Sequence, residues 1–231
     1  MTMQKALDVG LPIVAIVFLV VGGVLGLTVA PADKDMGDVY RIMYVHVPAA
    51  WAALLAVTVT FVASLVYLLK NNWHADALGE ASAEVGVFFG ALLIVLGSIW
   101  ARPTWGVWWD WDPRLTTAAI LLFAFAGYLA LRRFVDDPER RATWAAVAAI
   151  VAYVDVPILW FSVRWWRTLH QIQNTGESTH SVMTKSLLWN ALAFALLYVW
   201  FVRLRYRVAL ARQAEELAEP PETEPAHTPA P

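Results

Sequence analysis

The 231-residue sequence contains no cysteine. This absence excludes disulfide bonds, thiolate nucleophiles and iron–sulfur clusters. Charged residues are also scarce: they make up 16% of the chain, against about 25% in an average soluble domain. The 17 basic and 19 acidic residues give a net charge of −2, which argues against a nucleic-acid-binding protein. The sequence has no phosphate-binding loop and no nucleophile–base pair of recognisable spacing, so we do not predict an enzyme.

Hydrophobic residues, by contrast, make up 59% of the chain, and the mean hydropathy is +0.54. Six long runs contain at most one charged residue each, and about 20 apolar residues suffice for a helix to cross a bilayer. The runs cover residues 9–32, 42–69, 85–101, 115–131, 142–161 and 186–202. The sequence therefore predicts an all-α polytopic membrane protein, with a six-helix transmembrane domain over residues 1–212.

The two ends of the chain and its orientation can also be predicted. The first run is longer than the apolar stretch of about 7–15 residues in a secretory signal, so we expect it to remain as the first span. Residues 213–231 are rich in Glu, Ala and Pro, which predicts a disordered acidic tail. Ten of the 17 basic residues lie on the side that holds both termini, so the positive-inside rule places the termini in the cytoplasm. The loops at 31–45, 102–114 and 163–185 then face outward.

The 13 tryptophans are distributed unevenly. Ten of them fall on or near the predicted outer side: Trp51, Trp100, Trp105, Trp108, Trp109, Trp111, Trp160, Trp165, Trp166 and Trp189. An aromatic belt would populate both membrane interfaces. The asymmetry indicates a surface for a large, flat, apolar ligand, because such a ligand gains from stacking on indole rings. An anchor that holds a loop at the headgroups is the alternative.

The densest group of tryptophans lies in the loop at 102–116. Four tryptophans fall within seven residues and are followed by an acid and a base: Trp105, Trp108, Trp109, Trp111, Asp112 and Arg114. Pro113 predicts a turn before the fourth span, which Thr116 could cap.

Two histidines, His46 and His170, lie close to predicted span ends on the outer side. A neutral imidazole is the usual nitrogen ligand of haem iron. Taken singly, each is typical of an interfacial histidine with a hydrogen-bond partner. Together with the tryptophans, the pair favours ligation of a planar macrocycle from both faces. His180 lies in a polar stretch and is more typical of a solvated loop residue.

Haem also carries two propionates, which need cations at the water boundary, and the arginine fork suits a carboxylate. Arg41, Arg114 and Arg167 are candidates at outer-side helix ends or loops, with ordinary snorkelling as the alternative.

Asp155 lies at membrane depth two residues before Pro157. An ionisable group there is a functional candidate, unless it bonds to backbone freed by the proline.

Residues 105–116 match the pattern W-G-x-W-W-x-W-D-x-R-L-T at every fixed position. This run resembles the "WWD" signature of haem-handling proteins in cytochrome c biogenesis. By length and number of spans, the chain is most similar to the haem exporter protein C (CcmC) family within that superfamily. Segments 40–51 and 165–171 also resemble the outer-loop histidine segments of the family.

The resemblance implies a multi-pass protein of the bacterial inner membrane that binds haem b at the periplasmic face. It further implies delivery of haem to the chaperone CcmE, and assembly with the small subunit CcmD and the ABC subunits CcmA and CcmB. The axial ligands of the family would correspond to His46 and His170. Its WWD surface would correspond to Trp105, Trp108, Trp109, Trp111 and Asp112.

Three other functions remain open at this stage. A haem b subunit that exchanges electrons with quinone usually places its histidines within the spans, whereas these lie at span ends. A permease for an aromatic solute predicts broken helices and polar groups at the midplane. Only Asp155 and Pro157 fit that pattern. A structural scaffold leaves the one-sided tryptophans unexplained.

Overall fold

The structure is a computed structural model that describes residues 3–170 and 181–218. Within these residues the fold is all helical, without a strand. Six helical stretches are long and apolar enough to cross a membrane, which confirms the predicted six-span fold. The helices are α1 (Met3–Val24), α2 (Met43–Lys70), α3 (Trp73–Trp105), α4 (Pro113–Phe134), α5 (Pro138–Tyr153), α6 (Asp155–Trp165) and α7 (Ser181–Ala218). A π-helical turn, η1 (Leu25–Val29), extends α1, and a short 3-10 helix, η2 (Asp38–Ile42), leads into α2.

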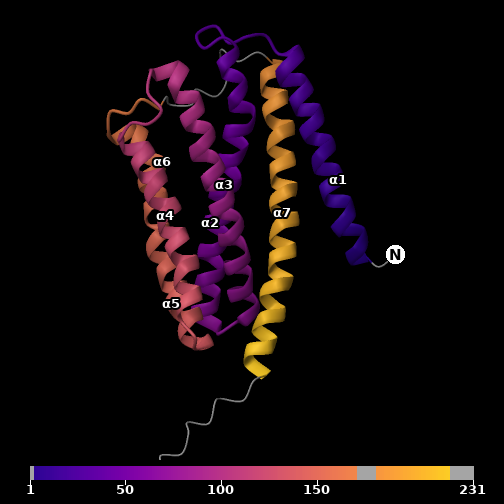
Figure 1. Cartoon of the computed structure of the whole chain (residues 1–231), viewed down its shortest axis with the longest axis vertical. Coiled ribbons are helices and arrows are strands. Elements are labelled where there is room, and N and C mark those ends of the chain that lie inside the picture. The colour runs from indigo at the N-terminus through magenta and orange to yellow at the C-terminus, as the bar shows by residue number, and fades with distance from the viewer. Residues whose placement is uncertain (1–2, 171–180, 219–231) are drawn as a thin grey trace, which may run out of the picture.

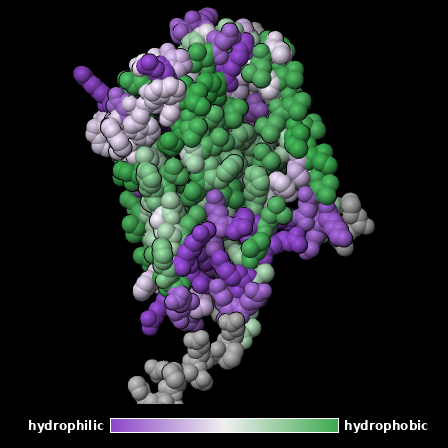
Figure 2. Space-filling model, viewed as in Figure 1, coloured by the Kyte–Doolittle hydropathy of each residue, from purple (hydrophilic) through white to green (hydrophobic). Residues whose placement is uncertain are grey.

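The helices form an elongated bundle (Figure 1). α2 and α3 lie in the middle and pack along each other, while α7 contacts both. α1 lies at one edge and packs mainly against α7, and α4, α5 and α6 form the opposite edge. Figure 2 shows a hydrophobic band between two hydrophilic ends, the distribution expected for a bundle that crosses a bilayer.

The centre of the bundle is built from small residues on α2. Ala49, Ala52 and Ala56 are buried against Phe89 of α3 and Phe194 of α7. Small side chains let helix backbones approach closely, which is how helices associate in lipid. The close packing fixes α2 and α3 relative to each other and so sets the positions of the loops at their ends.

The start of α4 differs from the sequence prediction. Asp112, not Thr116, caps this helix: its side chain accepts a hydrogen bond of 2.8 Å from the backbone N–H of Leu115. Pro113 occupies the first helical position, where a missing N–H costs nothing, so the residue before it becomes the cap. Thr116 lies inside the first turn instead.

The fifth span, predicted as one run, is broken into α5 and α6 at Val154. Pro157 lies in the first turn of α6 and has no N–H to continue the ladder of α5. Asp155 is the first residue of α6, and within the described residues its buried Oδ2 atom has no hydrogen-bond partner. The predicted hydrogen bond to freed backbone is therefore absent at this oxygen.

The first six residues of the predicted tail, 213–218, are helical, because α7 continues to Ala218. The side chain of Gln213 is buried and donates a 2.7 Å hydrogen bond to Asp76 of α3. Asp76 also accepts two hydrogen bonds, of 2.6 and 2.7 Å, from the buried guanidinium of Arg132 on α4. Packing against this polar cluster holds the last turns of α7 in helical form, an effect that composition does not reveal. The remainder of the predicted tail, residues 219–231, lies outside the described residues.

Candidate functional site at the tryptophan-rich end

The tryptophan-rich loop begins where α3 ends at Trp105. Gly106 adopts a left-handed conformation (φ 80°) and donates its N–H to the carbonyl of Arg102 at 3.0 Å, which turns the chain out of the helix. Trp108 and Trp111 are then 59% and 76% exposed. Exposed indoles in such density form an apolar surface of the kind that marks a binding site.

The other indoles of the loop support the exposed ones. Trp109 is partly buried, and its ring meets that of Trp111 edge to face, with centroids 5.6 Å apart. Trp105 packs in the same way on the buried Trp100, at 4.9 Å. The buried indole nitrogens of Trp100 and Trp109 have no hydrogen-bond partner within the described residues.

A second aromatic segment lies at the end of α6. Trp165 and Trp166 are 58% and 50% exposed, and Trp165 stacks on Phe161 with centroids 5.3 Å apart. Trp166 follows α6 with an extended backbone, and the non-helical segment after it leads to His170.

Asp112 joins the two tryptophan segments. Its carboxylate is buried, and its Oδ2 accepts hydrogen bonds from the Thr168 hydroxyl at 2.6 Å and from the Leu169 N–H at 2.9 Å. The Thr168 oxygen in turn accepts the backbone N–H of His170 at 3.1 Å. The structure therefore directs Asp112 toward protein donors, and this contact brings the loop before α4 to the segment that carries His170.

His46 lies in the first turns of α2, against α3. Its ring covers Gly97, where an added Cβ would come within 3.0 Å of the His46 Cε1 atom. The Nδ1 atom is buried and has no hydrogen-bond partner within the described residues. His46 also lies within electrostatic range of His170 and Arg114. The two predicted histidines are thus brought to one place from segments far apart in the sequence.

Comparison with known proteins identifies the family of the chain. A sequence model of the family described as heme exporter protein C matches residues 1–219. The chain belongs to the haem exporter protein C family.

Three curated relatives, each named heme exporter protein C, illustrate the likeness. The protein of Bradyrhizobium diazoefficiens is 41% identical over 189 residues, 80% of this chain and 72% of that protein. The Haemophilus influenzae protein is 38% identical over 202 residues, covering 86% and 82% of the two chains. The Escherichia coli K12 protein is 36% identical over 198 residues, covering 85% and 81%.

The three arginines that the sequence suggests as partners of the haem propionates differ in their surroundings. Arg114 is partly buried, donates to the Leu159 carbonyl at 3.1 Å and lies near His46. Arg167 is exposed on the segment of His170. Arg41 is engaged by protein: it pairs with Asp38 at 2.9 Å and donates to the carbonyl of Gly26, which ties η2 to η1.

Sequence reasoning missed Gly97, on which His46 packs, and Thr168, which accepts the N–H of His170. Gly97 lies inside an apolar run, and nothing in its neighbours indicates that a histidine of another helix covers it. Thr168 has an ordinary sequence context, and only the fold brings it to Asp112. His180, also considered from the sequence, lies outside the described residues.

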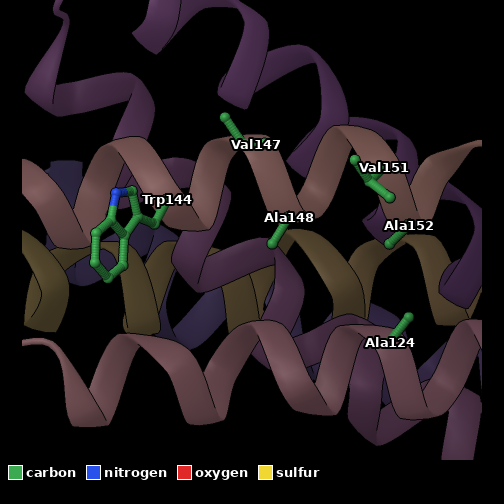
Figure 3. A pocket seen from close by; sticks show the side chains of 6 residues that line it. All are labelled: Ala124, Trp144, Val147, Ala148, Val151 and Ala152. Atoms are coloured by element: carbon green, nitrogen blue, oxygen red, sulfur yellow. The ribbon is translucent and has the colours of Figure 1, made fainter.

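An apolar hollow of about 430 Å³ lies elsewhere, between α4 and α5. Figure 3 shows its lining: Ala124, Trp144, Val147, Ala148, Val151 and Ala152. Its lining contains no ionisable side chain and neither histidine, so we do not include it in the candidate site.

Proposed function

We propose that this protein binds haem b at its tryptophan-rich end, with His46 and His170 as axial ligands, and passes the haem to a chaperone during cytochrome c maturation. The observation that carries the proposal is the placement of His46. A buried imidazole nitrogen without a hydrogen-bond partner is costly unless a ligand takes it up. Here it lies within electrostatic range of a second histidine, beside a surface of exposed indoles.

The residues of this end suit the chemistry of haem. Imidazole nitrogen is a common axial ligand, and the iron supplies the two open positions that such ligands occupy. His46 is fixed by α2 and α3, whereas His170 sits on the loop after α6. Ligands on a helix and on a separate loop suit a cargo that must be held and then released, because movement of the loop would remove one ligand.

The indoles and arginines provide the rest of the recognition. Trp108, Trp111, Trp165 and Trp166 offer flat apolar area at low conformational cost. Trp109 packs against Trp111 of that surface, and Trp105 packs on the buried Trp100. Arg114 and Arg167 are the arginines that neutralise the propionates in this proposal, because Arg41 already bonds to Asp38 and Gly26.

Delivery and orientation complete the proposal. The tryptophan-rich end faces the periplasm of the bacterial inner membrane, and both termini lie in the cytoplasm. The recipient of haem is the chaperone CcmE, and the protein works with CcmD, CcmA and CcmB. The family membership and the basic clusters at 132–141 and 203–212 support these assignments.

An absorption spectrum of the detergent-purified protein, as isolated and after dithionite, tests ligation. We expect a six-coordinate bis-histidine b-type spectrum in the parent and its loss in the His46→Ala/His170→Ala double variant. His74→Ala is the matched control, because His74 lies near the opposite end of the bundle and bonds to Tyr206. A parent without haem when expressed with added haem precursor would overturn the proposal.

A second experiment separates delivery from electron transfer with quinone. The haem-loaded protein is mixed with the apo form of the chaperone, and haem on each protein is measured after separation. Transfer to the chaperone supports delivery. Retention of haem, together with rapid reduction by a quinol, would instead support an electron-transfer subunit.

A further inference from the structure

We propose that Asp112 is a positioning residue that acts through Thr168 to hold His170 in its ligating position, and that its carboxylate does not touch haem. This inference rests on the proposed function, because it assumes that His170 is an iron ligand. It gives Asp112 a role different from that of the neighbouring tryptophans, whose indoles are proposed to contact haem.

The carboxylate of Asp112 is already occupied by the protein. Its Oδ1 accepts from the Leu115 N–H at 2.8 Å, and its Oδ2 accepts from Thr168 and Leu169 at 2.6 and 2.9 Å. The residue is only 8% exposed and sits at the N-terminus of α4, where the helix dipole favours a negative charge. A carboxylate with three donors in such a place is held firmly.

Thr168 passes this constraint to His170. Its hydroxyl hydrogen points to Asp112, so its oxygen is oriented to accept the N–H of His170 at 3.1 Å. The segment from Trp166 to His170 is not helical. The hydrogen bonds to Asp112 therefore fasten the segment to α4, on which Arg114 also sits.

Substitutions can separate the helix cap from the contact with the loop. In Asp112→Asn, the amide oxygen can still cap α4, since Asn and Asp are equally good caps. The amide nitrogen then faces the Thr168 hydroxyl and the Leu169 N–H, and it cannot accept from the latter. Thr168→Val removes the hydroxyl at nearly constant shape, and Thr168→Ser is the conservative control that keeps it.

The first readout is the haem spectrum. We expect Asp112→Asn, Thr168→Val and His170→Ala each to convert most of the six-coordinate low-spin signal into a five-coordinate high-spin signal. Exogenous imidazole should restore the low-spin signal, because a free ligand replaces a displaced one. Thr168→Ser should resemble the parent.

The second readout does not depend on haem. Because the chain has no cysteine, a single cysteine at Leu169, whose side chain is 41% exposed, can carry a nitroxide label. Electron paramagnetic resonance of the haem-free protein should show a more mobile label in the Asp112→Asn and Thr168→Val backgrounds than in the parent and Thr168→Ser backgrounds. A label at Val107, 39% exposed, is the control and should not respond to Thr168→Val.

The two readouts distinguish the possible failures. An equally immobile label in all four backgrounds overturns the positioning role of Asp112, whatever the spectra show. Loss of haem in Asp112→Asn that imidazole does not restore, with an unchanged label, also overturns it and indicates direct contact with haem. If the label becomes mobile but His170→Ala leaves the parent spectrum unchanged, the ligand assignment fails and with it the proposal that Asp112 positions a ligand.

Discussion

The imidazole of His46 lies over Gly97, close enough that a methyl group on Gly97 would stand 3.0 Å from the ring Cε1 atom. The contact packs the ring of His46 on α2 against α3, and Nδ1 has no hydrogen-bond partner within the described residues. It also explains why a glycine occupies the interior of α3 near the tryptophan-rich end, where a helix former would otherwise be preferred.

Gly97→Ala should therefore displace His46. The ring must leave its rotamer, at a cost of about 0.5–1.5 kcal/mol, so we expect haem to bind roughly two- to tenfold more weakly. Haem titration followed by absorbance measures the change. Gly127→Ala is the matched control, because a Cβ at Gly127 meets nothing within 4 Å. Equal affinity in both variants would contradict the steric role of Gly97.

The exposed indoles give a second prediction. Trp108→Ala or Trp111→Ala should each weaken haem binding roughly tenfold, or about 1.4 kcal/mol. Neither should lower the melting temperature of the haem-free protein, because these side chains are largely exposed. Trp144→Ala, on α5 and 53% exposed, removes a comparable indole away from the site and should leave haem affinity unchanged. A melting temperature that falls with Trp111→Ala would instead indicate a structural anchor.

Sequence predicted the six spans well because burial in lipid requires long apolar runs, which hydropathy reads directly. Helix ends were less predictable, since α7 extends to Ala218 through contacts with Asp76 that depend on the folded bundle. Likewise, Pro113 makes Asp112 the cap of α4, although Thr116 is an equally plausible residue type.

The candidate site was predictable in its residue types but not in its connections. His46 and His170 stand out in the sequence because histidine is scarce and both lie near tryptophans. Asp112 faces Thr168 and not open solvent. The two residues are 56 positions apart in the sequence, and no local pattern encodes their contact. Arg41, grouped with the other arginines by its location, proves to be engaged by Asp38 and Gly26.

The polar cluster at the opposite end supports a third prediction, about stability. Arg132 is buried and pairs with Asp76 at 2.6 Å and with Glu80 at 3.0 Å. Arg132→Ala removes the ion-pair partner of the buried Asp76 and leaves Glu80 paired with Arg212 alone, which should destabilise the protein by about 3–5 kcal/mol. Thermal unfolding in detergent and the amount of protein in the membrane measure the loss. The adjacent Arg133 is exposed, and Arg133→Ala should stay within about 0.5 kcal/mol of the parent.

The fourth prediction concerns orientation, which the absence of cysteine makes easy to test. Asp110, in the tryptophan-rich loop, and Asp136, between α4 and α5, are both exposed and lie at opposite ends of α4. A membrane-impermeant maleimide added to intact spheroplasts should label Asp110→Cys but not Asp136→Cys, which should react only after permeabilisation. The reverse pattern would place the tryptophan-rich end in the cytoplasm. Haem would then bind at the cytoplasmic face. The protein would load haem for export instead of receiving it at the periplasmic face.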